Sequence, residues 1–412
     1  MKIFIDSYGC SSNMADGQFI KKQIRQQQEH ELTPLCDAET VILNTCAVKN
    51  ATESKMLHRI RTYKAMNKRV IVTGCLPKVN GKVLEKHNVQ QVDTNSINKI
   101  NSAISDGANY FSGKPFDKTK SGFLLDETNV AIIPISEGCL NRCTFCGTKN
   151  ARGNLYSYSE ENIIAAMQNA IQQGKTEIYL TSQDSGCYGF DKKTSLPQLV
   201  SKLIQIPGDY KIRIGMMNPH HAVKIIDPLL EVMKSDKVYK FIHVPVQSGS
   251  DRVLMEMLRG HSTNEFYEVV EKARKAFPEI TIATDIIVGY PTEADADFQD
   301  TVGLIKRVKP AVMNLSKFYP RPNTAASRLK MHSTQVLAER SKTITRAFRE
   351  IRQDENNMEI GAEFVVACNG EKTRLGNYRQ VFLEKPAYGN HTIKIVAAGP
   401  LHLRAQVIET YI

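Results

Sequence analysis

The sequence contains no apolar run long enough to cross a membrane, and its first residues lack the apolar segment of a secretory signal peptide. Low-complexity tracts are also absent. These absences predict a soluble, cytoplasmic protein that does not act at a membrane. Acidic residues are outnumbered, with 43 Asp and Glu against 54 Lys and Arg, which gives a net charge of +11. The basic excess indicates a polyanionic partner such as nucleic acid, although a generically basic soluble protein would show the same balance.

The chain is long enough for several domains, with 412 residues of which 42% are apolar. Its nine cysteines are an odd number in a chain without a secretory signal. Because disulfides are rare in the cytosol, metal ligation is a better interpretation of these cysteines than a disulfide framework.

Three cysteines lie on one short segment, where Cys139, Cys143 and Cys146 stand at positions i, i+4 and i+7. This spacing allows three thiolates to face a single metal centre. A structural zinc or an ordinary iron–sulfur cluster takes four protein ligands, so a set of three predicts a cluster with one open iron. An open iron can hold a substrate. The alternatives are a zinc knuckle or three unrelated buried thiols.

Another set of three cysteines follows from a repeated unit in the first hundred residues. Apolar runs at 2–5, 41–43 and 70–72 each lead to a cysteine and then to a helix-like polar stretch. Apolar strands that alternate with helices predict a parallel, doubly wound sheet, whose strands all end at the same edge. Helix N-termini at that edge favour a negatively charged cluster. The pattern predicts a second metal site, with small buried core residues as the alternative; its ligands would be Cys10, Cys46 and Cys75.

The middle of the chain repeats a strand–helix unit about six times, which predicts a partial or full (βα) barrel with polar residues at its C-terminal rim. A segment near 106–128, rich in Gly, Ser, Lys and Asp, is interpreted as the linker that precedes it. The expected strands are 130–135, 176–180, 211–214, 241–249 and 280–288, and the expected helices include 159–173 and 264–277.

The last part of the chain changes character. One apolar face predicts a long helix, through Leu337, Ile344, Phe348, Ile351 and Met358. Short β segments divided by Gly, Asn and Pro follow it and predict a small oligonucleotide-binding barrel. The predicted domains are 1–112, 128–350 and 351–412.

The cysteine loop, with Phe145 before its last cysteine, resembles the signature of radical S-adenosylmethionine (SAM) enzymes. The order of domains resembles the methylthiotransferase family over essentially the whole chain. This resemblance implies an α/β fold with an N-terminal doubly wound parallel sheet, a central partial (βα) radical-SAM barrel and a small C-terminal OB-like β-barrel, the tRNA-binding TRAM domain. Its motifs are Tyr8-Gly9-Cys10 with Asn13 and Asp16, Asn44-Thr45-Cys46, Thr73-Gly74-Cys75, 151–153, 245–250 and 285–291.

Within the family, residues 146–153 and 318–322 look most like the archaeal and eukaryotic branch. The resemblance then implies a tRNA methylthiotransferase that converts N6-threonylcarbamoyladenosine at position 37 of tRNA to its 2-methylthio derivative. Isopentenyladenosine at position 37 and an aspartate of a ribosomal protein remain alternative substrates. An RNA-binding protein with structural or redox-sensing iron–sulfur clusters is the alternative from another class.

Radical cofactors suit this reaction because the C2–H bond of adenine is not acidic and C2 offers no leaving group for acid–base or nucleophilic catalysis. The resemblance implies two [4Fe–4S] clusters and two SAM molecules per turnover. One cluster, on the loop cysteines as catalytic centre, cleaves SAM to a radical, and the other carries the sulfur that becomes the methylthio group. The resemblance also implies an electron donor such as a ferredoxin or a flavodoxin, and we expect a monomer.

Strand-end polar and aromatic groups are the candidate SAM contacts: Phe145, Gln183, Asp184, Arg213, Asn218, His243 and Gln247. Cations near the cluster loop, and cations beside an aromatic residue in the C-terminal barrel, are the candidate tRNA or substrate contacts. These are Lys149, Arg152, Arg374, Asn377, Tyr378 and Arg379. No role is assigned to Cys36, Cys187 or Cys368.

Overall fold

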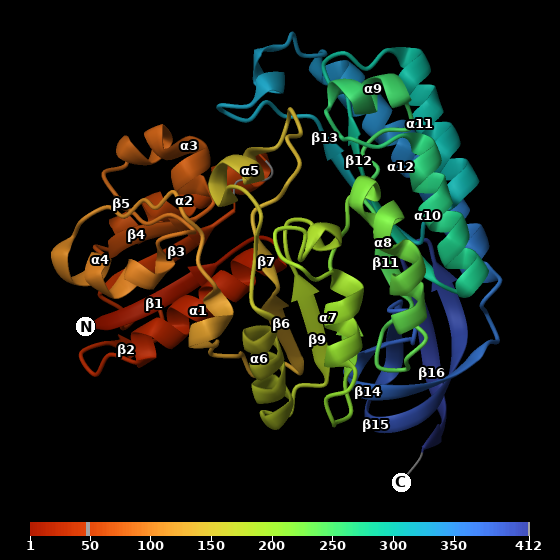
Figure 1. Ribbon diagram of the computed structural model, residues 1–412, viewed down its shortest axis with the longest axis horizontal. Coiled ribbons are helices and arrows are strands. Elements are labelled where there is room, and N and C mark those ends of the chain that lie inside the picture. Colours follow the sequence, from red (N-terminus) through yellow and green to blue (C-terminus); the bar gives the residue numbers. More distant parts are fainter. Residues whose placement is uncertain (47–49, 411–412) are drawn as a thin grey trace. The chain divides into compact units, whose positions relative to one another are not determined.

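The structure is a computed structural model that describes residues 1–46 and 50–410. The chain divides into two compact units, one of residues 1–216 with 319–329 and the other of residues 217–318 with 330–412. Figure 1 labels their helices and strands. Each unit is described by itself, and the predicted division into three domains stays a prediction. Among the described residues, no helix combines the length and hydropathy that are required to span a bilayer.

The first unit opens with a five-stranded parallel sheet in the order β2-β1-β3-β4-β5. The chain runs from β1 outward to β2 and then returns past β1 to build β3, β4 and β5. This reversal between β1 and β3 is the switch point at which doubly wound folds bind their ligands. The strands are β1 (Lys2–Ser7), β2 (Glu31–Leu32), β3 (Thr40–Thr45), β4 (Arg69–Gly74) and β5 (Gln90–Gln91).

Alternating side chains of the central strand β3 pack on opposite faces of the sheet. Ile42 joins a core with Phe19 and Ile100, whereas Val41 and Leu43 join a separate core on the other face. Helices cover both faces, as a doubly wound sheet requires, so this part of the fold prediction is confirmed. The helices are α1 (Ser11–Arg25), α2 (Asn50–Ala65), α3 (Leu76–Glu85) and α4 (Ile100–Asp106) with the short η1 (Ile97–Lys99).

The segment predicted as a linker is packed into the first unit instead. It contains a 3-10 turn, η2 (Lys118–Ser121), and Phe123 lies in the core beside β1. The side chain of Lys118 is 1% exposed and pairs with two carboxylates. The linker prediction is wrong for this stretch, because polar composition alone does not reveal a lysine that is buried against distant acidic partners.

A three-stranded parallel sheet, in the order β10-β9-β6, completes the first unit. Between β6 and β9, a short antiparallel pair of β7 with β8 flanks helix α5. The predicted strand–helix repeat is confirmed here. Its elements are β6 (Val130–Pro134), β7 (Ser136–Glu137), α5 (Gly147–Arg152), β8 (Tyr156–Ser157), α6 (Glu160–Gln172), β9 (Glu177–Thr181), η3 (Ser185–Cys187), α7 (Leu196–Leu203) and β10 (Lys211–Arg213).

The second unit continues the repeat with the parallel sheet β11-β12-β13. Strand β13 is not among the strands predicted from the sequence. Its residues are exposed or half-buried, so it lacks the continuous apolar run that marks a buried strand. The elements are α8 (Pro219–Val232), β11 (Phe241–His243), α9 (Asp251–Glu256), α10 (Thr263–Ala276), β12 (Thr281–Val288), α11 (Asp295–Val308) and β13 (Val312–Lys317). Residues 319–329, with η4 (Ala325–Arg328), belong to the first unit.

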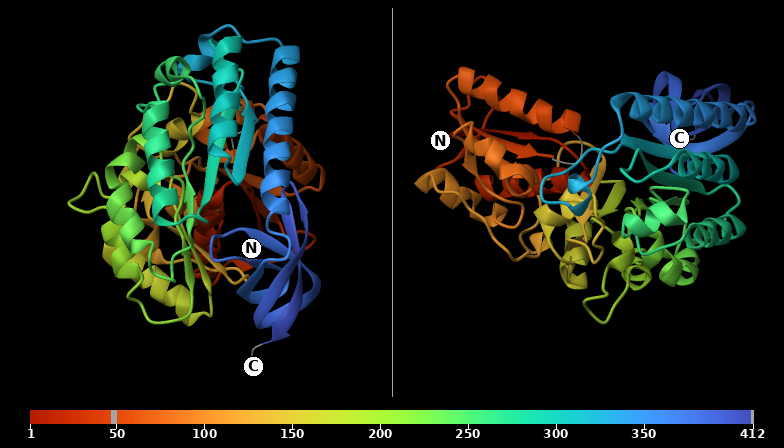
Figure 2. Two further views of the ribbon diagram at one scale, coloured as in Figure 1. Left: turned by 90° about the vertical axis from the view of Figure 1, so that its right-hand side faces the viewer. Right: turned by 90° about the horizontal axis from the view of Figure 1, so that it is seen from above.

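The predicted long helix is α12 (Thr334–Asn357), and it buries Leu337, Ile344 and Phe348 along one face. Met358, expected on the same face, lies beyond the helix end and is 73% exposed. Figure 2 shows α12 leading into the strands of the C-terminal barrel.

The barrel consists of three long bent strands where short strands were expected: β14 (Glu363–Arg374), β15 (Gln380–Gly399) and β16 (His402–Thr410). The first half of β15 pairs with the end of β14, and its second half pairs with the start of β14. Residues of β16 pair with both halves of β15 at Leu403 and Ala405, so the sheet closes on itself. This closure confirms the predicted barrel.

Candidate functional site

The three strand-end cysteines meet at the carboxyl edge of the first sheet. Cys10 and Cys75 are the N-cap residues of α1 and α3, and Cys46 directly follows β3. A Cβ atom placed on Gly9, whose φ is +120°, would lie 2.7 Å from the Cβ of Cys46. Only glycine fits there, and its small size lets the β1 and β3 loops approach each other closely.

The thiols of this set share one electrostatic environment. Burial raises the pKa of the Cys75 thiol to about 12; Arg152 opposes the shift, and the thiols of Cys10 and Cys46 add to it. Cys10 is exposed, whereas Cys46 and Cys75 are buried. The group therefore has one accessible side, and soft thiolate donors near helix N-termini and a cation fit an iron–sulfur cluster.

The second cysteine set lies on the loop between β7 and α5. The Cys146 amide donates to the carbonyl of Cys143 over 3.1 Å, and the Cys139 amide donates to Gly153 over 3.2 Å, which closes the loop. Burial raises the pKa of Cys146, and the nearby Cys143 and Cys139 thiols add to that shift. The three thiols therefore lie close together, as a three-thiolate cluster site requires.

Cys187 has a position that its sequence context did not indicate. A hydrogen bond from its thiol lowers the pKa of Cys139 to about 7, against the opposing effect of burial. Its sulfur also lies 3.1 Å from the carbonyl oxygen of Asp184. Cys187, which belongs to the next strand–helix unit, thus stabilises the thiolate of Cys139. The only signal in the sequence for this contact is the position of Cys187 three residues after Asp184.

Two of the predicted SAM contacts hold the cysteine loop. Gln183 Oε1 accepts from the Gly138 amide at 2.6 Å, and its Nε2 donates to Ser12 Oγ at 3.2 Å. Asp184 accepts from Asn141 Nδ2 at 3.0 Å, and the same nitrogen lies 3.4 Å from Cys139 Sγ. Both residues therefore lie beside the loop where a cofactor contact was predicted.

Phe145 and Arg213 also belong to the first unit. Phe145 is half-buried on the loop between Cys143 and Cys146. Arg213 ends β10, and its guanidinium lies 5.6 Å from the ring centroid of Tyr179.

The remaining predicted SAM contacts belong to the second unit. Asn218 caps α8 and accepts from the His220 amide at 3.1 Å, which gives it a structural role. His243 Nε2 lies 2.8 Å from Asp285 Oδ1, and the Gln247 amide donates to the Asp285 carbonyl over 2.8 Å. Gln247 has a φ of +77°, an uncommon conformation for a residue other than glycine.

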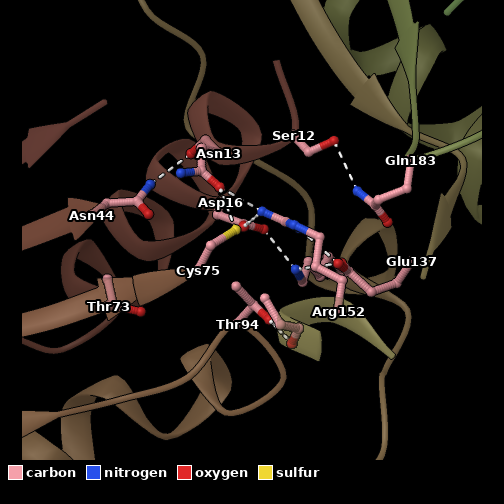
Figure 3. Close-up of polar contacts among 12 residues, drawn as sticks. Ser12, Asn13, Asp16, Asn44, Thr73, Cys75, Thr94, Glu137, Arg152 and Gln183 are labelled. Atoms are coloured by element: carbon pink, nitrogen blue, oxygen red, sulfur yellow. Dashed lines mark hydrogen bonds and ion pairs between the residues drawn. The ribbon is translucent and has the colours of Figure 1, made fainter. Parts of the chain in front are cut away.

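Arg152, predicted to contact tRNA or substrate, is buried instead. Its side chain is 1% exposed and pairs with Asp16 at 2.7 Å and with Glu137 at 2.6 Å. Figure 3 shows the guanidinium pointing toward these two residues and Asn13. The prediction of an RNA contact is wrong, because a residue this deeply enclosed cannot reach a phosphate backbone. Lys149 is half-buried and donates to the Cys139 carbonyl and, at 2.9 Å, to Asn154 Oδ1, so it stabilises the cluster loop.

The predicted RNA-binding group of the barrel also has internal partners. Tyr378 packs against two rings of the strand–helix region, with centroid distances of 5.0 Å to Tyr239 and 4.8 Å to Phe241. Asn377 donates to the Glu279 carbonyl at 3.1 Å, and Arg379 forms an ion pair with Glu359. Arg374 lies over the Tyr378 ring at 4.1 Å. These contacts dock the barrel within the second unit. Tyr378 is half-buried, and its contact with single-stranded RNA stays a prediction.

The fold and the cysteine loop define a radical SAM enzyme with an additional three-cysteine site. Residues 133–305 match the Radical SAM superfamily, and residues 2–94 match the uncharacterized protein family UPF0004. The structure is similar to the radical SAM methyltransferase TsrM from Kitasatospora setae, with a TM-score of 0.60, 11% identity and coverage of 79% of this chain and 76% of that chain. At this identity the similarity shows the fold alone.

Curated relatives identify the family. The chain is 38% identical over 99% of its length, and 100% of the relative's, to the "Probable threonylcarbamoyladenosine tRNA methylthiotransferase" of Pyrococcus horikoshii. It is 37% identical to the Homo sapiens threonylcarbamoyladenosine tRNA methylthiotransferase over 84% of this chain and 62% of that protein. The chain belongs to the threonylcarbamoyladenosine tRNA methylthiotransferase family.

Proposed function

We propose that this protein methylthiolates C2 of N6-threonylcarbamoyladenosine at position 37 of tRNA. The observation that carries the proposal is the pairing of two three-cysteine sets in one compact unit, in a chain whose relatives are named for this reaction. A single set would suit many radical SAM reactions. The second set supplies what a methylthio transfer also needs, namely a site that holds sulfur.

Each cysteine set would hold a [4Fe–4S] cluster and leave one iron without a protein ligand. When bound, the loop cluster and SAM supply radical chemistry, which suits a C2–H bond that acid–base catalysis cannot break. The protein orients the ligands: Gln183 and Asp184 hold the loop that carries Cys139 through Gly138 and Asn141. We propose that Gln183 and Asp184, with Phe145, also contact SAM. Arg213, Asn218, His243 and Gln247 remain proposed contacts.

A row of cationic and aromatic side chains on adjacent strands of the barrel supports tRNA as the substrate. Lys372 on β14 lies opposite Phe382 on β15 in the strand register, and Phe382 lies opposite Arg404 on β16. The Lys372 amine lies 5.2 Å from the Phe382 ring centroid, and the His402 ring stands edge-on to Phe382 at 6.0 Å. Lys372 and Arg404 are exposed. An aromatic ring between cations suits an unpaired base with its flanking phosphates.

Cations beside the N-terminal cysteine set add to this support. Helix α2 places Lys55 and Arg59 at 4.9 Å and 5.8 Å from the ring of Tyr8, just before Cys10 in the chain. An RNA that delivers a base to this set would bring its phosphates near such cations. We also propose that the protein acts as a monomer and takes electrons from a donor such as a ferredoxin or a flavodoxin.

Nucleoside mass spectrometry of tRNA tests the proposal. Cells that lack the gene should lose the 2-methylthio nucleoside and accumulate threonylcarbamoyladenosine, and the wild-type gene, but not a Cys143→Ala variant, should restore the product. Accumulation of isopentenyladenosine instead would identify the alternative tRNA substrate. An unchanged tRNA profile would exclude tRNA and point to a ribosomal protein, whose aspartate methylthiolation the same cells would show by peptide mass spectrometry.

A further inference from the structure

We propose that Arg152 is a positioning residue that connects the two cysteine sites. In this proposal, which rests on the proposed function, Arg152 fixes Asn13 beside the N-terminal cysteines and stabilises the negative charge of a cluster held there. Three features support the proposal. Arg152 belongs to an enclosed group of four charges, and it contacts Asn13, whose side chain joins all three N-terminal cysteine loops. Helix α5 starts at the loop site and ends with Arg152 beside the N-terminal site.

The four charges are two cations and two carboxylates, each 1–2% exposed. Lys118 Nζ lies 2.6 Å from Asp16 and 2.6 Å from Glu137, and Arg152 lies 2.7 Å and 2.6 Å from the same two carboxylates. Each carboxylate therefore bridges both cations, so the group is neutral as a whole. Buried charges are retained only when they are paired in this way, and the loss of one partner leaves the others uncompensated.

Asn13 connects this group to the cysteines. Its Nδ2 donates to the carbonyl of Tyr8 at 2.9 Å and to that of Thr45 at 2.7 Å, so it joins the loops of Cys10 and Cys46. Its Oδ1 lies 3.6 Å from Cys75 Sγ and accepts from Arg152 at 2.6 Å. One amide thus contacts all three cysteine loops. Arg152 fixes its orientation, and Figure 3 shows Asn13 beside Cys75 and Arg152.

Helix α5 carries this arginine at its end. Cys146 is the N-cap of the helix and Arg152 its last residue, so a short rigid element joins a ligand of the loop site to the charge beside Cys75. The Thr94 hydroxyl donates to the Ala151 carbonyl at 3.1 Å and holds the same end of α5. The placement of Arg152 therefore depends on the loop that carries Cys146.

A buried arginine elsewhere provides a matched control. Arg340 in the second unit is 6% exposed and pairs with Glu293 at 2.6 Å and Asp295 at 2.7 Å. A merely structural role predicts that Arg152→Gln and Arg340→Gln have similar consequences. A positioning role predicts a change in the N-terminal cluster for the first variant alone.

The test uses the full chain with the loop cysteines replaced, so that only the N-terminal set takes up iron after anaerobic reconstitution. Iron content and an EPR-monitored redox titration are the readouts. Arg152→Gln should lower iron uptake several-fold and shift the midpoint potential to more negative values, because a cation near the cluster favours its reduced form. Arg152→Lys should recover part of the shift, and Arg340→Gln should leave both readouts unchanged.

With the N-terminal cysteines replaced instead, Arg152→Gln should leave the EPR signal of the loop cluster unchanged. If Arg152→Gln fails to fold, the Arg152→Gln/Glu137→Gln double variant keeps the buried group neutral, and Asn13→Ala removes the amide alone; each should still alter the EPR signal of the N-terminal cluster. Parent-like potential and EPR signal in these variants, or equal changes in Arg340→Gln, would overturn the proposal. An N-terminal set that takes up no iron in the parent chain would overturn the proposed function itself.

Discussion

Replacement of Tyr378 by alanine should loosen the C-terminal barrel from the rest of the second unit. The ring packs against Tyr239, edge to face at a centroid distance of 5.0 Å, and against Phe241, in a tilted arrangement at 4.8 Å. The Arg374 guanidinium lies over the same ring, 4.1 Å from its centroid. The substitution removes all three contacts and leaves the two partner rings facing solvent or a cavity.

The expected cost follows from these contacts. Two aromatic pairs contribute about 1–3 kcal/mol together beyond their buried area. Loss of a half-buried ring adds about 1–2 kcal/mol. We therefore expect Tyr378→Ala to lower the free energy of unfolding of the second unit by about 2–5 kcal/mol. Tyr378→Phe keeps the ring contacts and should lower it by less than about 1 kcal/mol.

Urea unfolding and limited proteolysis measure this cost. Tyr378→Ala should unfold at lower urea and release the barrel faster to a protease. Tyr388→Ala is the matched control, because Tyr388 lies on the same barrel and is 73% exposed. Unchanged unfolding of Tyr378→Ala together with a loss of tRNA affinity would refute this reasoning and support the predicted RNA contact of Tyr378.

The remaining predictions concern the cysteine sites and pH. Cys143→Ala should abolish both cleavage of SAM and methylthiolation while tRNA binding, measured by filter binding, persists. Cys46→Ala should still release 5′-deoxyadenosine from SAM but form no methylthio product. Gly9→Ala should lower iron uptake by the N-terminal cysteine set, because its Cβ would lie 2.7 Å from the Cβ of Cys46 and 3.2 Å from Cys46 Sγ. Burial lowers the pKa of His261 to about 3, so between pH 6.5 and 3 the unfolded state binds a proton that the folded state excludes. His261 should then contribute a fall in the free energy of unfolding of about 1.4 kcal/mol per pH unit as the pH drops through this range, and His261→Gln should reduce the measured slope by that amount.

Each of these expectations has a result that contradicts it. Methylthio product from Cys143→Ala would exclude the radical mechanism assigned to the loop cysteines. Equal loss of both activities in Cys46→Ala would contradict the division of labour between the two sites. Parent-like iron uptake by Gly9→Ala would show that the β1 and β3 loops adjust freely. An acid slope that is as steep in His261→Gln as in the parent protein would assign the proton uptake to another group.

The sequence by itself determined the parts that depend on local pattern. The spacing of Cys139, Cys143 and Cys146 places three thiols on one loop whatever surrounds them. Cys10, Cys46 and Cys75 are far apart in the chain, yet each follows an apolar strand, and parallel strands end at one edge of their sheet. Periodicity likewise predicted α12, because a face that is buried along a helix repeats in the sequence.

Only the tertiary structure decided which polar residues are enclosed. Lys118 lies in a stretch whose composition indicates a linker, and Arg152 looks like a free cation beside the cluster loop. Their partners Asp16 and Glu137 come from separate elements, and no periodicity links the four positions. Tyr378 shows the same limit, since its neighbours in the sequence do not reveal that the fold brings Tyr239 and Phe241 against its ring. Spacing encodes local geometry, whereas burial depends on elements that meet only when the chain has folded.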